Sequence, residues 1–353
     1  MTVNTKSRTN NETMKWKVLL IILFSLLCQN LFSQFTWQRI YTSTIGGDEE
    51  AYDICEADSN NYYVGGIAAP FYRYTFVLKI NSSGDTLWRR TYFGGEIYTL
   101  APVSDGGCIF AGYFGGAFAC RIKPNGDTLW VRTFNAINFM DIKKSNDGNY
   151  LLCGTEYSND RYNGFVCKID TTGNTIWERI YPANVSIDFV TIEPGIDGGF
   201  IVGGVKRDIQ GGPRFSYLCR INDTGTVTWE RNYLLSIDNY VSSIQQLNTG
   251  YILTGRSLEN VYLQKINSNG DSIQTSILSN TNGVSMGPVL SKANNNKYYL
   301  AHVNYLSSRI YSVDSNLVIN KQLIFDLPSP RGISLSSIIN VSTSSVGDLI
   351  CIG

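Results

Sequence analysis

One short segment recurs along the chain, and this recurrence constrains the fold more than any other feature. Residues 79–92 read KINSSGDTLWRRTY, and similar copies follow at 121–134, 168–181 and 220–233. The tryptophans of this pattern are separated by 51, 42, 47 and 52 residues; they are Trp37, Trp88, Trp130, Trp177 and Trp229. A period of about 40–50 residues is typical of β-propeller blades, whereas horseshoes and β-helices have shorter repeats.

Each repeat contains four segments that read as β-strands. In the first complete repeat they are residues 51–55, 62–66, 75–80 and 86–92. They are rich in β-branched and aromatic residues and are bounded by Gly, Asn, Asp and Ser, which is the usual pattern of strands and turns. The chain is therefore predicted to be all-β, with four-stranded blades.

Glycine recurs at two positions of the repeat, and each has a structural reason. The turn before the Trp-containing strand needs a residue with positive φ, which favours glycine. The second strand also ends in glycine, which allows close approach of two backbones near a central axis. The turn glycines are Gly84, Gly126, Gly173, Gly225 and Gly270, and the strand glycines include Gly112, Gly154, Gly204 and Gly255.

Counting the repeats predicts a seven-bladed propeller within a single domain, residues 34–353. Six complete units cover roughly residues 50–325, and residues 331–353 supply the first two strands of a seventh. Residues 35–41 match only the last strand of a repeat, so we expect this N-terminal strand to complete the closing blade, since closure protects sheet edges. A third strand for that blade is missing, so either the blade is incomplete or the chain continues beyond Gly353.

Residues 1–33 are predicted to be a targeting segment. Lys15 and Lys17 precede an apolar run at 18–27, which is shorter than the ~20 residues of a membrane-spanning helix. We expect Met14 to be the true start and cleavage to follow Ser33, so that no transmembrane span remains. A lipid anchor on Cys28 is the rival interpretation, although bulky leucines precede that cysteine. The predicted location is secreted or in the outer cell envelope.

Charge and composition exclude several classes of partner and cofactor. Basic and acidic residues number 29 each, so no basic field exists for nucleic acid. His302 is the only histidine and no Cys-x-x-Cys occurs, so neither a metal site nor a cofactor is expected. Three cysteines share one repeat position and are predicted to lie in the core; they are Cys120, Cys167 and Cys219. A single disulfide between Cys108 and Cys120 remains open.

The repeat resembles that of a known group of proteins. The pattern Asp-Gly-Gly-(Tyr/Phe)-Ile, followed by Lys-Ile-Asn-x-x-Gly-Asp-Thr-x-Trp, is similar to the secreted β-propeller repeat proteins of Bacteroidota over about residues 40–353. Many of those carry a C-terminal sorting domain for type IX secretion, which does not occur in this sequence. The pattern is also broadly similar to pyrroloquinoline-quinone-type propellers. The resemblance implies export, and it supplies no catalytic residues.

The repeated tryptophans are predicted to pack between blades rather than to bind a ligand, because one ring per blade at one strand position buries a large apolar area. Function is instead expected in the loops that join second to third strands, at 68–74, 156–163 and 206–215. Aromatic and arginine side chains there are typical of binding surfaces. The candidate residues are Tyr157, Arg161, Tyr162, Arg207, Arg214 and Phe215. We expect a monomer that binds a protein or a glycan without catalysis.

A polysaccharide-acting hydrolase or lyase is the alternative function. It requires two carboxylates that converge in the central channel. The acids near the first strands are Asp53, Glu56, Glu96, Asp141, Asp188 and Asp238. A Gly-x-Ser-x-Gly match at 283–287 lacks the following helix that the motif needs, so no catalytic residue is assigned.

Overall fold

The computed structural model describes residues 39, 41, 48–58, 60–69, 74–182, 184–207, 211–279, 287–293, 297–303, 308–325, 340–343 and 349–352. The chain divides into two units, Met1–Tyr41 and Thr42–Gly353. The predicted targeting segment, Trp37 and almost all of the strand expected at 35–41 lie outside the described residues.

The second unit contains six four-stranded antiparallel sheets and one two-stranded sheet, each with its strands in chain order. The first three sheets are β1 (Asp48–Asp58), β2 (Asn61–Ala69), β3 (Tyr74–Asn81), β4 (Thr86–Gly94); β5 (Glu96–Pro102), β6 (Cys108–Tyr113), β7 (Ala117–Ile122), β8 (Thr128–Phe134); and β9 (Asn138–Lys144), β10 (Tyr150–Ser158), β11 (Arg161–Ile169), β12 (Thr175–Tyr181). The next three are β13 (Ser186–Pro194), β14 (Phe200–Arg207), β15 (Arg214–Ile221), β16 (Val227–Tyr233); β17 (Asn239–Gln246), β18 (Gly250–Ser257), β19 (Asn260–Asn267), β20 (Ser272–Leu278); and β21 (Val289–Lys292), β22 (Lys297–Val303), β23 (Ser308–Asp314), β24 (Ile319–Phe325). The last is β25 (Asn340–Thr343) with β26 (Leu349–Ile352).

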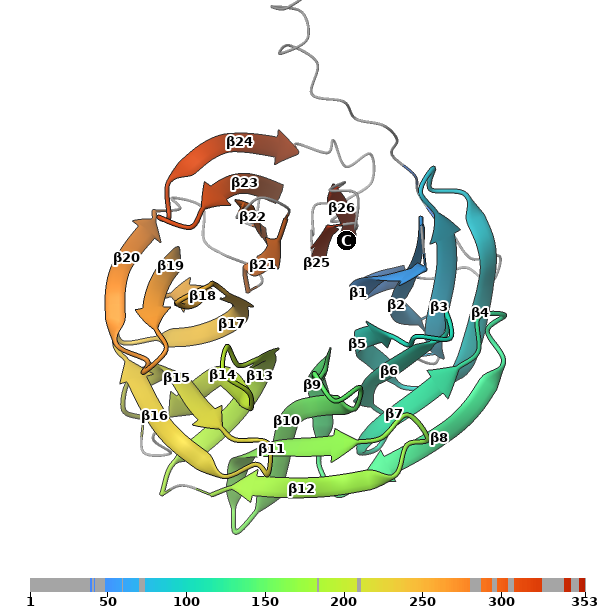
Figure 1. Ribbon diagram of the computed structural model, residues 1–353, viewed down its shortest axis with the longest axis horizontal. Helices are drawn as coiled ribbons and strands as arrows, with labels where there is room; N and C mark the ends of the chain where they lie inside the picture. The colour runs from blue at the N-terminus through green and yellow to red at the C-terminus, as the bar shows by residue number, and fades with distance from the viewer. Residues whose placement is uncertain are drawn as a thin grey trace, which may run out of the picture. The chain divides into compact units, whose positions relative to one another are not determined.

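These sheets are the blades of a β-propeller, which confirms the predicted fold class. The first strand of every sheet lies innermost and the fourth lies outermost (Figure 1). Each innermost strand contacts the next one along the chain, and β25 contacts both β21 and β1. Within the described residues, the ring of this unit thus has six four-stranded blades, and the two-stranded sheet occupies the seventh place. Those two strands are the ones expected from residues 331–353.

The core lies between neighbouring blades, because each sheet is packed on both faces. In β6, Cys108 to Ala111 are all fully buried, as an inner strand covered on both sides requires. Cys120, Cys167 and Cys219 are also fully buried. Cys108 pairs in register with Ile122, not Cys120, and both cysteines are free thiols, so the disulfide left open above does not form.

The repeated glycine expected at the end of the second strand lies within that strand, as in β10 and β14, and faces a bulge in the first strand. A Cβ atom on Gly154 would lie 2.0 Å from the carbonyl oxygen of Asn138, and on Gly204 it would lie 1.9 Å from that of Asp188. The bulges interrupt the pairing of β9 with β10 and of β13 with β14 at these glycines. Glycine is therefore required here, since any side chain would overlap a backbone oxygen.

The repeat tryptophans that the structure describes each contact the next blade along the chain. The indole N–H of Trp88 donates to the carbonyl oxygen of Pro124 at 3.0 Å, in the turn between β7 and β8. The equivalent bonds join Trp130 to Thr171, Trp177 to Asp223 and Trp229 to Ser268. Where the repeat has Gln274 instead, its amide donates to the oxygen of Asn316 at 3.1 Å. The contact is kept although the ring is lost.

The arginine two residues after each tryptophan lies on the same side of its strand. The guanidinium of Arg132 is 5.8 Å from the ring centroid of Trp130, and that of Arg179 is 5.9 Å from Trp177. Arg90 pairs with Asp127 of the next blade at 3.1 Å. The ion pair of Arg90 with Asp127 attaches the outer strand of one blade to the turn of the next, whereas the arginine–tryptophan contacts lie within one strand.

Candidate binding face

The two ends of the blades differ in chemistry. Because consecutive strands are antiparallel, the connections between second and third strands share one face with the connections between blades. We call this the loop face. The other face carries the turns between first and second strands and between third and fourth strands. The connections between third and fourth strands are tight turns. In the first five blades, the glycine N–H of this turn donates a hydrogen bond to a backbone oxygen, as Gly84 does to the carbonyl oxygen of Asn81.

Exposed large apolar side chains among the described residues fall into two groups. One group lies on or beside the outermost strands, such as Leu129 and Ile176. The other lies at the loop face; its members are Tyr74, Tyr113, Phe114, Tyr157, Tyr162, Leu234, Ile237 and Leu258. Apolar side chains that gather at loop ends are a usual mark of an interaction surface.

Three of the predicted site residues meet across two blades. The rings of Tyr157 and Tyr162, at the ends of β10 and β11, have centroids 5.2 Å apart. The guanidinium of Arg207, from β14 of the next blade, lies 5.4 Å from the centroid of Tyr162. Arg207 is fixed by an ion pair with Asp188 at 2.8 Å. The result is an aromatic surface with a cation stacked on it.

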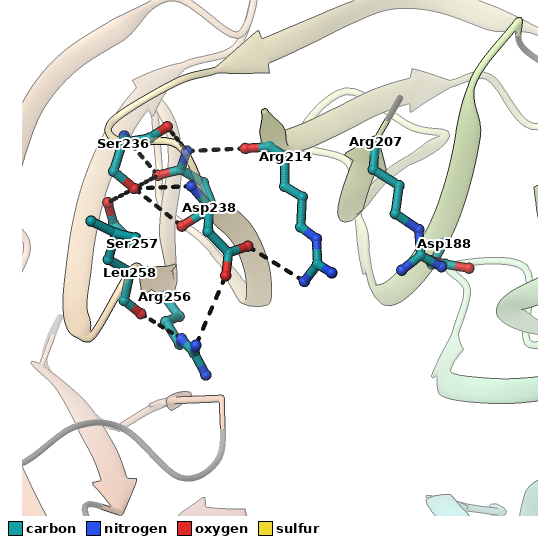
Figure 2. A network of polar contacts seen from close by, with 9 residues as sticks. Asp188, Arg207, Arg214, Ser236, Asp238, Arg256, Ser257 and Leu258 are labelled. Carbon is teal, nitrogen blue, oxygen red and sulfur yellow. Dashed lines mark hydrogen bonds and ion pairs between the residues drawn. The ribbon is translucent and has the colours of Figure 1, made fainter. Parts of the chain in front are cut away.

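The other three predicted residues are placed differently. Arg161 lies in the β10–β11 hairpin, where it pairs in register with Ser158. Phe215 is only partly exposed and pairs in register with Lys206. Arg214 belongs to a separate cluster, in which the guanidinium groups of Arg214 and Arg256 both approach the carboxylate of Asp238, at 3.5 and 3.9 Å (Figure 2).

Hydrogen bonds hold this second cluster in one geometry. The side chain of Asn239 is fully buried; its amide donates to the carbonyl oxygens of Arg214 and Ser236 at 3.1 and 2.6 Å. The hydroxyl of Ser257 donates to that of Ser236 at 2.9 Å (Figure 2). Three connections, before β15, before β17 and between β18 and β19, are thereby joined. Preorganised loops of this kind lower the entropy cost of binding.

Sequence reasoning missed part of this cluster. Asp188 lies in the innermost strand β13 and Asp238 directly before β17, near the first strands as expected, and each forms an ion pair with an arginine. Arg256, Leu258 and Asn239 were not singled out. One signal was available: Asp238 and Asn239 interrupt the apolar pattern just before a first strand.

Charged groups near the innermost strands form a third cluster. Asp53 accepts hydrogen bonds from the backbone N–H groups of Ile54 and Leu100, at 2.7 and 2.5 Å. Asp141 accepts one from Ile192 of the next blade at 3.0 Å and pairs with Lys143 at 3.0 Å. These two carboxylates therefore link neighbouring blades.

Burial shifts the ionisation of this cluster. It raises the pKa of Asp53 to about 6 and the pKa of Glu193 to about 7, and the ammonium group of Lys143 partly offsets both shifts. Burial alone would lower the pKa of Lys143, but the carboxylates of Asp141, Glu193 and Asp53 raise it above its usual value. The cluster is thus electrostatically coupled.

His302, the only histidine of the sequence, lies in the core. His302 is buried, its ring stacks on Tyr311 with a centroid separation of 5.6 Å, and burial lowers its pKa to about 4. Ser285 lies outside the described residues. Within the described residues, no group of three or more His, Cys, Asp or Glu side chains is arranged to hold a metal ion.

Comparison with known proteins gives the fold and no family. No protein-family model matches the chain, and no curated protein matches it. Among solved structures, the WD40 β-propeller domain of Doa1 is similar with a TM-score of 0.59 at 13% identity, over 87% of this chain and 90% of that one. A protein of unknown function from Bacteroides caccae is similar with a TM-score of 0.50 at 15% identity, over 76% of this chain and 94% of that one.

These likenesses support the β-propeller fold. In the part of the chain that the structure describes, no helix has the length and apolar character needed to cross a membrane.

Proposed function

We propose that this protein is a secreted or cell-envelope propeller that binds a protein or glycan partner through its loop face and catalyses no reaction. The observation that carries the proposal is the contact of Tyr157 and Tyr162 with Arg207 across two blades, beside the arginine cluster around Asp238. Tyrosine and arginine dominate the energetics of many interfaces, and loops on a rigid scaffold are where binding residues concentrate.

Export rests on the N-terminal pattern. The basic residues Lys15 and Lys17, the apolar run at 18–27 and the small residue Ser33 are the parts of a secretory signal. The likeness of the repeat to secreted Bacteroidota propellers supports the same location.

A capture experiment tests the binding function. The wild-type chain and a loop-face variant, Tyr157→Ala with Tyr162→Ala and Arg207→Gln, are immobilised and exposed to envelope proteins of the source cell and to a panel of polysaccharides. We expect the variant to lose at least tenfold in capture of a ligand that the wild type retains. A matched variant, Leu129→Ala with Ile176→Ala, removes exposed apolar groups from the outer strands and should bind as the wild type does. Equal capture by all three proteins would refute the proposal.

A polysaccharide hydrolase or lyase is the second candidate, and one observation favours it. The raised pKa values of Asp53 and Glu193 near Lys143 resemble those of general acids that work close to neutral pH. Reducing-end and unsaturated-product assays on the same polysaccharide panel test it. Product that forms with the wild type and not with Glu193→Gln would support catalysis; no product with either protein removes this candidate.

A further inference from the structure

The outermost strand of the fifth blade differs from the other outermost strands in its charge. In the four-stranded sheets that the structure describes, the other outermost strands each carry at least one charged residue; examples are Arg89 of β4, Arg132 of β8, Arg179 of β12, Arg231 of β16 and Lys321 of β24. The strand β20 reads SIQTSIL and carries none. Charged side chains on edge strands hinder pairing with another molecule, so β20 lacks this protection.

One edge of β20 is open. The strand is the last of its sheet and pairs with β19, from Val261 opposite Leu278 to Lys265 opposite Gln274. Within the described part of the chain, residues 272–278 form no backbone hydrogen bond beyond this pairing. Figure 1 shows β20 at the rim of the ring. The N–H and C=O groups on its outer edge are therefore available to a further strand.

The side chains along this edge are neutral and exposed. Ile273 is 57% exposed and Ile277 is 51% exposed. Gln274 stands where the first four complete repeats have tryptophan, and Ser276 stands where they have the arginine two residues later. The amide of Gln274 keeps the hydrogen bond to the next blade. This blade therefore keeps the contact that builds the ring and lacks the charge at the middle of its outer strand.

The edge is complementary to itself in the antiparallel direction. When Ser276 of two copies lies opposite Ser276, Thr275 of each copy lies opposite Ile277 of the other. Residues 274–278 pair with β19 without a bulge, so this stretch can continue the sheet on its other side. Cross-strand pairs of β-branched residues stabilise a sheet. Two copies make each of these pairs twice, which favours a second copy over an unrelated extended segment.

We propose that two copies of this chain associate through β20, whose open edge pairs with β20 of the second copy in an antiparallel register centred on Ser276. This inference goes beyond the proposed function and replaces the monomer expected from the sequence. Both copies use the same edge, so the contact closes as a two-fold dimer. Two edge strands bury less surface than a permanent interface does, and we therefore expect the dimer to dissociate on dilution.

Such a dimer presents two binding faces. The strand β20 begins at the turn after β19, on the face opposite the loop face, and runs toward the loop face. Antiparallel pairing therefore directs the loop faces of the two copies in opposite directions. The contact itself lies at the rim, so both loop faces stay open to partners.

Sedimentation velocity of the purified full chain over a series of concentrations tests the association. We expect the wild type to pass from monomer to dimer as its concentration rises. Ser276→Arg gives this blade the arginine of the other repeats and places two like charges opposite each other. It should weaken the dimer at least tenfold and melt at the wild-type temperature. Thr133→Arg adds the same charge to an exposed position of β8 and should dimerise as the wild type does.

A cysteine at the two-fold axis tests the register. In Ser276→Cys the introduced thiols of the two copies lie opposite each other, so oxidation in air should link the copies by a disulfide. Thr133→Cys is the matched control and should give only the background of the wild type on a non-reducing gel.

Three results would overturn the inference. The first is a wild-type protein that stays monomeric at every concentration. The second is a dimer that Ser276→Arg and Thr133→Arg weaken equally. The third is cross-linking of Ser276→Cys no greater than that of Thr133→Cys.

Discussion

The indole N–H of Trp130 donates a hydrogen bond at 3.1 Å to the carbonyl oxygen of Thr171, which belongs to the next blade. The same ring lies against Gly173, where a Cβ atom would approach it to 2.9 Å. Gly173 has a φ of +82°, so the turn needs glycine for its backbone as well as for this contact. Trp130 of one blade and Gly173 of the next thus form a single contact surface between the two blades.

The first prediction concerns this interface. Trp130→Ala should lower the free energy of unfolding by about 3–5 kcal/mol, because a buried ring and its hydrogen bond are lost together. Trp130→Phe keeps an aromatic ring and should cost about 1–2 kcal/mol. Urea unfolding followed by circular dichroism measures both. Leu129→Ala, at the exposed neighbour, is the control and should change stability by less than about 0.5 kcal/mol. Equal effects of Trp130→Ala and the control would contradict the packing role.

The second prediction concerns the glycine that faces the bulge. Gly154→Ala places a methyl group 2.0 Å from the oxygen of Asn138, so β9 and β10 must separate. We expect a loss above about 3 kcal/mol or failure to fold, judged by soluble yield and thermal melting. Gly116→Ala is the control, since its methyl group would meet nothing closer than 3.6 Å. A Gly154→Ala protein as stable as this control would show that the bulge is not a constraint.

The third prediction is a pH dependence. A carboxyl whose pKa is raised on folding stabilises the fold while it is protonated. For Glu193 this contribution is complete below its ordinary pKa of 4.5 and is lost as the pH rises through about 7. The loss is on the order of 2 kcal/mol, because one pKa unit corresponds to about 1.4 kcal/mol and the partial solvent exposure of Glu193 screens part of the shift.

Glu193→Gln should therefore flatten the dependence of unfolding free energy on pH between 4.5 and 8. Chemical denaturation at a series of pH values measures it. Glu178→Gln, at an exposed position of β12, should leave the slope as it is in the wild type. An unchanged slope in Glu193→Gln would show that another group causes the pH dependence.

The fourth prediction concerns Asn239, whose hydrogen bonds support the cluster around Asp238. Asn239→Leu removes the hydrogen bonds that the side-chain amide of Asn239 donates to the carbonyl oxygens of Arg214 and Ser236, which are partly buried. We expect a loss of about 1–3 kcal/mol in stability. The connection before β17 should also become more mobile, which hydrogen exchange of its amides measures. Asn125→Leu in an exposed turn is the control. Unaltered exchange at 236–239 in Asn239→Leu would disprove the supporting role.

The blades were predictable from the sequence because neighbouring blades pack against each other through the same kinds of contact. The first four blades each present a tryptophan ring to a turn and the first five a glycine to a bulge, so Trp130 and Gly154 have counterparts at a regular spacing. The two-stranded seventh sheet followed from counting these units. By contrast, the inferred strand at 35–41 lies outside the described residues, and its place in the closing blade stays a prediction.

The binding face was predictable only in part. The long connections between strands predicted Tyr157, Tyr162 and Arg207 as binding residues. The sequence did not show that Arg207 stacks on Tyr162, which lies 45 residues earlier. Such contacts depend on the angle between adjacent blades. Asp238 was expected near a first strand and lies directly before β17, but its contacts with Arg214 and Arg256 could not be read from the sequence, because those arginines belong to other connections.

The bond from each tryptophan to the following turn has a direction, which makes the interface between blades heterologous. Every blade from the first to the fifth gives a side-chain donor, Trp or Gln, to its successor, and every blade from the second to the sixth receives one. Head-to-tail interfaces of this kind form rings only when the rotation per unit closes the circle. The contacts themselves would serve a longer or a shorter array equally well, so curvature, and not the residues at the interface, sets the number of blades.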